Sequence, residues 1–193
     1  VGRVSDVILF HHAQGLTTGL HALADDLRAA GHRVHAPDVY GGTTFAGLEE
    51  GVAHARATGF QRLFDDAVAA ADALPADAVY LGVSLGVLPA QHLAQNRPGA
   101  RGAVLVGSAV PAAEFGSAWP AGVPLQIHAM DADPVFVGDG DIEAAQELVA
   151  QAGAELFLYP GDGHLFVDRS LPDHDQVAAE LFLERVLALL ARV

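Results

Sequence analysis

The chain has 193 residues, of which 51% are hydrophobic and 18% charged, a composition that suits one folded domain and excludes a disordered chain. Its formal net charge of −14 argues against nucleic acid or an anionic membrane surface as a partner. The sequence contains no cysteine, which excludes disulfides, cysteine metal sites and a thiol nucleophile.

Strand and helix patterns alternate along the first half of the chain. An apolar run predicts a buried strand over residues 7–10, and leucines at helical spacing predict a helix over residues 20–30 that ends at Gly31. A short strand over 34–36 stops at Pro37. After an irregular stretch, the pattern predicts helices over 48–57 and 60–74, a strand over 78–81 and a helix over 85–95.

The same alternation continues to the end of the chain, with strands predicted over 102–106, 125–130 and 155–159, and helices over 142–152 and 177–192. Residues 111–120, between the first two of these strands, are rich in proline and glycine and are predicted to form a surface segment. Continuous apolar strands between helices are typical of a parallel sheet covered on both faces. We therefore expect an α/β fold, one domain over residues 1–193 without a cap domain, whose mostly parallel sheet has about six to seven strands flanked by helices.

One serine lies between two glycines where a predicted strand meets a predicted helix, in the sequence Gly82-Val83-Ser84-Leu85-Gly86. This arrangement is typical of a nucleophile elbow, a tight turn in which the glycines permit close packing and the serine hydroxyl is exposed above the sheet. The adjoining helix N-terminus favours a developing negative charge. The alternative, a glycine–serine turn without a chemical role, is disfavoured by the flanking strand and helix.

A serine nucleophile needs a base and an acid that orients the base, and both residue types follow later strands. His164 lies in a glycine-rich loop after the last predicted strand, and we expect it to be the base rather than a surface histidine. Asp133 is preferred as the acid over Asp131, which could instead stabilise a turn, and Asp162 is too close to His164 in sequence. The order Ser, Asp, His is that of α/β-hydrolase triads.

An oxyanion hole needs two backbone N–H donors, and we expect these from Leu85, directly after the nucleophile, and from Ala13, in the loop after the first strand. The neighbouring His11 and His12 have no third ligand at suitable spacing, so no metal site is predicted. His12 is expected to line the pocket wall, and a catalytic role for it stays open. The other candidate wall residues, each of which could equally pack in the core, are Gln14, Tyr40, Phe45, Phe115, Trp119, Val135 and Phe136.

Taken together, these motifs resemble the dienelactone hydrolase family of α/β-hydrolases over nearly the whole chain. The resemblance rests on the elbow, on Asp133-Pro134 and on three further stretches: residues 11–16 (HHAQGL), 36–42 (APDVYGG) and 159–166 (YPGDGHLF). It implies a compact, lidless fold, hydrolysis of an ester or lactone without metal or organic cofactor, and the roles of nucleophile for Ser84, acid for Asp133 and base for His164.

Two departures from the family pattern bear on the chemistry. The best-known members carry cysteine at the elbow, where this chain has Ser84, and a glutamate in the loop after the first strand, where this chain has His12 or its neighbour. That glutamate takes part in activating the cysteine, so its loss fits an ordinary serine mechanism. The arginines that hold the carboxylate of dienelactone are not matched, since Arg169 is out of register, and dienelactone itself is not the expected substrate.

The sequence therefore predicts a serine hydrolase that cleaves a small-molecule carboxylic ester or lactone through an acyl-enzyme on Ser84, with no cofactor. Two alternatives stay open: a thioesterase or acyltransferase on the same residues, and a catalytically silent α/β-hydrolase that acts as a binding module. No signal peptide and no membrane span is evident, so a cytoplasmic protein is expected. The sequence does not indicate the oligomeric state.

Overall fold

Six strands form one parallel sheet in the computed structural model, which describes residues 4–193. The strand order across the sheet is β2-β1-β3-β4-β5-β6, and every neighbouring pair is parallel. The strands are β1 (Asp6–Phe10), β2 (Arg33–His35), β3 (Ala78–Val83), β4 (Gly102–Val106), β5 (Leu125–Met130) and β6 (Glu155–Tyr159).

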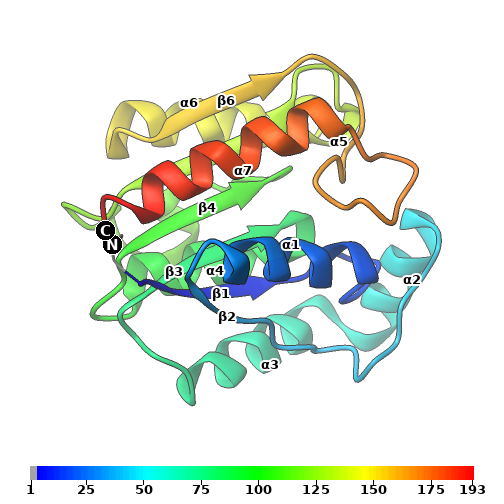
Figure 1. Ribbon diagram of the computed structural model, residues 1–193, viewed down its shortest axis with the longest axis horizontal. Helices are drawn as coiled ribbons and strands as arrows, with labels where there is room; N and C mark the ends of the chain where they lie inside the picture. Colours follow the sequence, from blue (N-terminus) through cyan, green and yellow to red (C-terminus); the bar gives the residue numbers. More distant parts are fainter. Residues whose placement is uncertain (1–3) are drawn as a thin grey trace.

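Helices cover both faces of this sheet (Figure 1). On one face lie α1 (Thr18–Ala29) and α7 (Gln176–Leu190), and on the other lie α3 (Phe60–Asp72), α4 (Val87–Asn96) and α6 (Asp141–Ala152). The remaining helices, α2 (Leu48–Thr58) and the short α5 (Pro134–Gly138), lie in connections at the carboxyl ends of the strands. The predicted α/β fold with a parallel sheet is confirmed.

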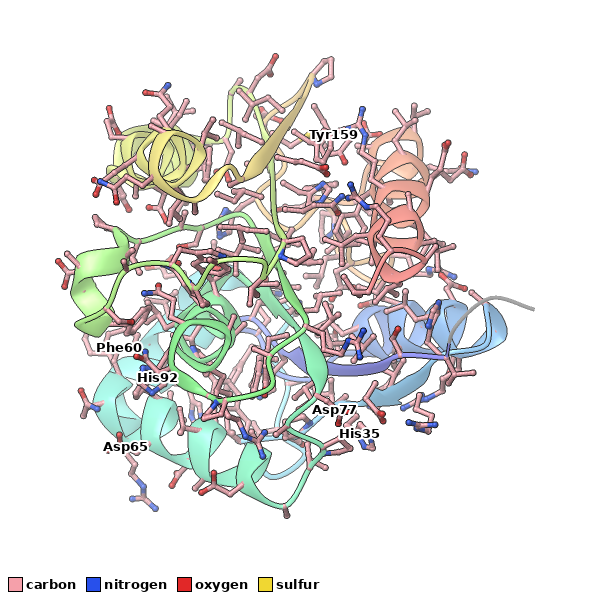
Figure 2. All side chains as sticks on the ribbon, turned by 90° about the vertical axis from the view of Figure 1, so that its left-hand side faces the viewer. His35, Phe60, Asp65, Asp77, His92 and Tyr159 are labelled. Atoms are coloured by element: carbon pink, nitrogen blue, oxygen red, sulfur yellow. The ribbon has the colours of Figure 1, made fainter. Side chains whose placement is uncertain are left out.

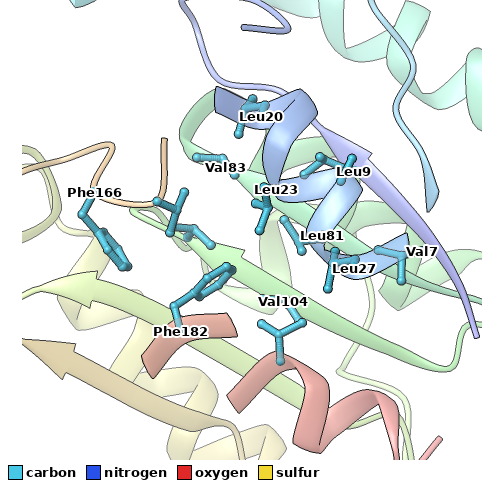
Figure 3. Packing of buried hydrophobic residues seen from close by; sticks show 14 of the residues in the cluster. Val7, Leu9, Leu20, Leu23, Leu27, Leu81, Val83, Val104, Phe166 and Phe182 are labelled. Atoms are coloured by element: carbon cyan, nitrogen blue, oxygen red, sulfur yellow. The ribbon is translucent and has the colours of Figure 1, made fainter. Parts of the chain in front are cut away.

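The core has two layers because successive strand residues point to opposite faces of the sheet. In β1, Val7 and Leu9 pack with the leucines of α1, whereas Ile8 and Phe10 pack with α3 and α4. Figure 3 shows the first layer, in which the apolar side chains of α1 meet those of β1, β3 and β4 and Phe182 of α7. Burial on both faces explains why the central strands read as continuous apolar runs.

The structure differs from the predicted elements at several boundaries, and two differences bear on the site. Strand β3 extends two residues further, to Val83, so it runs directly into the elbow. The helix α5 was not predicted, because five residues are too few for helical periodicity to show. Strand β6 has the predicted bounds, but it lies at the edge of the sheet and is only partly covered, with Leu158 43% exposed.

The sheet reverses its direction of growth between β1 and β3, which are neighbours although β2 separates them in sequence. Ligand sites of parallel α/β sheets form at such a point, outside the carboxyl ends of the strands. The register pairs Phe10 with Gly82, so the loop after β1 and the turn after β3 emerge side by side. Within residues 4–193, no helix is both long and apolar enough to cross a membrane.

A fully buried histidine, His128 on β5, links the sheet to α7. Its Nδ1 is 2.9 Å from the hydroxyl of Tyr159, which lies between β6 and α7 (Figure 2), and its Nε2 is 3.3 Å from Gln126 Oε1. Burial lowers the pKa of His128 to about 3, with a smaller contribution from the charge of Arg185. The folded protein therefore keeps this side chain neutral at acid pH values where an unfolded chain would protonate it.

We expect His128 to make the fold sensitive to mild acid. Below pH 6.5 His128 binds a proton in the unfolded state, whereas in the folded state it stays neutral down to about pH 3. The free energy of unfolding therefore falls as the pH is lowered through this range. The loss is at most about 1.4 kcal/mol per pH unit. Urea unfolding at pH 4 to 7 tests this against His128→Gln, and the advantage of the wild type should shrink towards pH 4. A difference that does not depend on pH would contradict it.

Candidate active site

The turn between β3 and α4 has the geometry of a nucleophile elbow. Ser84 has a φ of 50°, and among the described residues it alone combines a positive φ with a side chain. The flanking glycines are required by space: a Cβ on Gly82 would lie 2.3 Å from the carbonyl oxygen of Gly86, and one on Gly86 would lie 2.2 Å from that of Phe10. The turn is therefore strained at Ser84 and closely packed on both sides, as the sequence predicted.

A chain of two short hydrogen bonds connects Ser84, His164 and Asp133. Ser84 Oγ lies 2.8 Å from His164 Nε2, and His164 Nδ1 lies 2.6 Å from Asp133 Oδ2. Asp133 is fully buried, His164 is 6% exposed, and Ser84 is partly exposed to solvent. With Nδ1–H donating to the carboxylate, the lone pair of Nε2 faces the serine hydroxyl.

Asp133 is held in place by the start of α5. Its Oδ1 accepts a hydrogen bond of 2.9 Å from the Val135 N–H and so caps the helix, while Oδ2 faces His164. Of the two other aspartates weighed from the sequence, Asp131 is exposed and accepts from the Gly161 N–H at 3.0 Å, and Asp162 is exposed. Asp133 is thus the aspartate that the fold places against His164.

The imidazole of His164 packs directly against the chain after β4. Gly107 has a φ of +73°, and a Cβ placed there would lie 3.1 Å from His164 Cε1 and 3.4 Å from Nδ1. A larger residue at this position would have to displace the ring. Backbone packing on one side and the Asp133 carboxylate on the other therefore fix the orientation of His164.

The loop after β1 presents a free backbone donor next to the elbow. The carbonyl oxygen of His12 accepts from the Gly15 N–H at 3.0 Å and contacts His11 Nδ1 at 2.8 Å. The His12 C=O and the Ala13 N–H belong to one planar peptide group and point in opposite directions. The contacts of the carbonyl oxygen therefore also fix the direction of the Ala13 N–H. That N–H has no acceptor within residues 4–193, although Ala13 is only 3% exposed.

His12 does not line an open pocket, which corrects the interpretation from the sequence. Its side chain is fully buried, and its Nε2 lies 2.8 Å from Oδ2 of Asp168, which is fully buried too. The sequence analysis missed Asp168. No local pattern marks this residue, because its partner lies 156 positions earlier in the chain.

The other candidate wall residues are mostly packing residues. Gln14 is buried and donates to the carbonyl oxygens of Phe45 and Ala46, at 3.0 and 3.1 Å. Phe136 is fully buried in the core beneath α5, so it does not form a pocket wall. Trp119 is half-buried, donates to the Val123 carbonyl at 2.7 Å and packs against the same core layer.

Tyr40 and Phe45 pack near the elbow, whereas Phe115, at the end of a short 3₁₀ helix (Ala112–Phe115), and Val135, in α5, are half-buried. Tyr40 contacts the group of apolar side chains that includes Leu85, and burial raises its pKa to about 12. Its hydroxyl has no hydrogen-bond partner among the described residues. Tyr40 is thus a neutral, buried neighbour of the turn.

A narrow, largely apolar cavity of about 20 Å³ adjoins Leu85 and Gly86, the two residues after Ser84. Its one polar side chain, His11, has both ring nitrogens occupied, at 2.8 Å from the His12 carbonyl oxygen and 3.3 Å from the Val39 N–H. The pocket extends between α3 and α4 towards Phe60, which is 45% exposed and lies near His92 in Figure 2. Within residues 4–193, no group of three or more histidine or acidic side chains is placed to hold a metal ion.

Comparison with known proteins agrees with this architecture. The model of the dienelactone hydrolase family matches residues 2–193. A Klebsiella pneumoniae protein assigned as a dienelactone hydrolase has a TM-score of 0.77 at 18% identity, over 100% of this chain and 88% of that one. A dienelactone hydrolase-like promiscuous phosphotriesterase from metagenomic libraries has a TM-score of 0.71 at 19% identity, over 100% and 87%.

A dienelactone hydrolase from Anabaena variabilis is similar too, with a TM-score of 0.62 at 19% identity over 96% of this chain and 87% of the other. At these identities the structural likenesses show a shared α/β-hydrolase fold. The search of curated proteins finds no match. The family match confirms the resemblance that the sequence motifs indicated.

Proposed function

Because this chain belongs to the dienelactone hydrolase family, we propose that it is a serine hydrolase that cleaves a carboxylic ester or lactone through an acyl-enzyme on Ser84. The observation that carries the proposal is the hydrogen-bonded chain from Ser84 through His164 to Asp133. A serine hydroxyl is a weak nucleophile unless a base accepts its proton, and here the base lies 2.8 Å from the hydroxyl oxygen.

In the first half of the proposed reaction, Ser84 Oγ attacks the substrate carbonyl carbon and its proton passes to His164 Nε2. Asp133 accepts from Nδ1–H, which keeps the ring in the required tautomer and stabilises the imidazolium as it forms. The negative oxygen of the tetrahedral intermediate is bound by the N–H groups of Ala13 and Leu85. His164 then gives its proton to the leaving alkoxide, and the acyl group stays on Ser84.

In the second half, water attacks the acyl-enzyme carbonyl and gives a proton to His164 Nε2. Collapse of the second tetrahedral intermediate breaks the bond to Ser84 Oγ, which regains its proton from His164. The carboxylic acid leaves and the resting state returns. The burial of Asp133 supports this scheme, because a charge shielded from water interacts more strongly with the imidazolium.

The apolar lining of the small cavity beside Leu85 supports a substrate with a small apolar group next to its reacting carbonyl. We therefore expect esters and lactones with a small, uncharged acyl group to be turned over in preference to esters that carry a charge close to the carbonyl. Small substrates fit a site that is partly open, as the exposure of Ser84 indicates.

Pre-steady-state kinetics with p-nitrophenyl acetate and p-nitrophenyl butyrate test the proposal. An acyl-enzyme should produce a burst of p-nitrophenol of about one equivalent per active site, followed by slower turnover. A panel with matched oxyesters, δ-lactones and thioesters distinguishes the ester or lactone hydrolase from a thioesterase. The proposal is overturned if the folded protein turns over no ester or lactone, or if it turns over thioesters alone.

A further inference from the structure

A second buried histidine–aspartate pair lies beside the candidate site and is not used by the proposed reaction. His12, in the loop after β1, and Asp168, in the loop after His164, are both fully buried and are joined by the 2.8 Å contact between Nε2 and Oδ2. Two ionisable side chains are costly to remove from water unless their hydrogen bonds are satisfied. Their placement therefore calls for an explanation.

Asp168 has a full set of donors. His12 Nε2 and Thr17 Oγ1 donate to Oδ2, while the N–H and the hydroxyl of Ser170 donate to Oδ1 at 2.9 and 2.6 Å. Burial raises the pKa of Asp168, but the hydrogen bonds from His12, Ser170 and Thr17 outweigh this and lower it to about 2. The carboxylate is thus ionised and fixed to three segments: the loop after β1, the start of α1 and its own loop.

The other nitrogen of His12 holds the backbone next to the free donor. Its Nδ1 accepts from the Gln14 N–H at 3.2 Å, which requires the neutral ring with the proton on Nε2, facing Asp168. The Ala13–Gln14 peptide is confined on its carbonyl side as well, since a Cβ on Gly51 would lie 2.3 Å from the Ala13 oxygen. The imidazole therefore connects Asp168 by hydrogen bonds to the Ala13–Gln14 peptide, which directly follows the Ala13 N–H.

The His12–Asp168 hydrogen bond connects the loop after β1, which carries Ala13, to the loop that carries His164. The proposed reaction requires these two loops to keep a fixed relative position. Asp168 follows His164 by four residues, and its N–H donates to the Leu165 carbonyl at 2.9 Å, which ties its position to the loop that carries the base. His12 directly precedes Ala13, the proposed oxyanion donor. An oxyanion donor stabilises the transition state only within a few tenths of an ångström of its productive position.

We propose that His12 and Asp168 are positioning residues, which hold the Ala13 N–H in the place where it can bind the oxyanion formed at Ser84. The inference rests on the proposed function. Neither residue contacts substrate in this scheme. They act through the backbone of the loop after β1, so their loss weakens binding of the transition state and leaves binding of the substrate unchanged.

Two substitutions at His12 separate its two hydrogen bonds. His12→Asn keeps an acceptor near the Nδ1 position for the Gln14 N–H and loses Asp168, whereas His12→Gln keeps a donor near the Nε2 position and loses Gln14. Asp168→Asn preserves volume and removes the charge. We expect each variant to lower kcat about 10-fold to 100-fold at unchanged KM, part of the loss that follows removal of an oxyanion donor.

The measurement is kcat per active site, with sites titrated by the p-nitrophenol burst so that misfolded protein does not count. His128→Gln is the matched control, since it removes an equally buried histidine whose own ring contacts lie on β5, β6 and α7. It should lower the Tm and keep the wild-type kcat. Affinity for a trifluoromethyl ketone, whose hemiketal mimics the tetrahedral intermediate, should fall in parallel with kcat/KM in the His12 and Asp168 variants.

The wild type separates the two proposals. If it turns over no ester or lactone, the proposed function fails. If it turns over esters while the folded variants keep wild-type kcat per site, or change KM alone, the positioning role is overturned. Should the buried variants not fold, Ser170→Ala removes one of the four donors of Asp168 from an exposed residue, and a kcat equal to wild type would overturn the role as well.

Discussion

Replacement of Ser84 by alanine is expected to lower kcat for ester hydrolysis by at least about 10⁴-fold. The change removes the one hydroxyl that lies 2.8 Å from His164 Nε2 and leaves the proposed oxyanion donors, Leu85 and Ala13, in place. Only the weak catalysis that the remaining groups give to attack by water should persist. Steady-state kinetics on an ester that the wild type turns over provides the measurement, and a variant within tenfold of wild type would contradict the assignment.

The same position allows a matched comparison of strain. Ser84 holds a φ of 50°, which disfavours any residue with a Cβ, so Ser84→Gly should be more stable than Ser84→Ala by about 1 kcal/mol. Both variants lack the hydroxyl, so the difference isolates the backbone. Thermal or urea unfolding measures it. Equal stability of the two would show that the turn stores no strain at Ser84.

The second large effect is expected for Asp133→Asn, which should lower kcat about 10⁴-fold at nearly unchanged stability. An asparagine fits the same space and can still accept from the Val135 N–H through Oδ1. Its NH₂ group would then face His164 Nδ1, which would have to become an acceptor. The proton would move to Nε2, and the ring could no longer accept the proton of Ser84.

Asp131→Asn is the matched control for this prediction, because Asp131 is exposed and serves the backbone of the Gly161 turn. It should keep kcat within a factor of about three of wild type, as surface substitutions outside a site have small effects. If the two variants lost activity equally, the choice of Asp133 over Asp131 would be wrong. Far-ultraviolet circular dichroism and Tm show whether each variant is folded.

Local patterns in the sequence predicted the sheet and the elbow because each depends on neighbouring residues. The apolar runs of β1, β3, β4 and β5 are buried on both faces, so their composition alone indicates a parallel sheet. The glycines around Ser84 are required by contacts within the turn and with β1. The sequence order of Ser84, Asp133 and His164, together with their places after strands, was enough to expect that they meet.

Other parts of the site depend on contacts that a sequence does not display. The role of His12 follows from Asp168, 156 residues away, so the sequence suggested a pocket wall where the structure has a buried pair. Phe136 was a candidate wall residue in the sequence, equally able to pack in the core. Helix α5 instead turns its side chain into the core, and that helix is too short to be predicted from periodicity.

The central claim, that Ser84 is an activated nucleophile, is tested most directly by the intact mass of the protein after reaction with a fluorophosphonate. Such a reagent phosphonylates a serine whose proton is taken by an adjacent base, with loss of fluoride. The account predicts one adduct per chain on the wild type and none on Ser84→Ala. A folded wild type that stays unmodified, or an adduct that persists on Ser84→Ala, would contradict it.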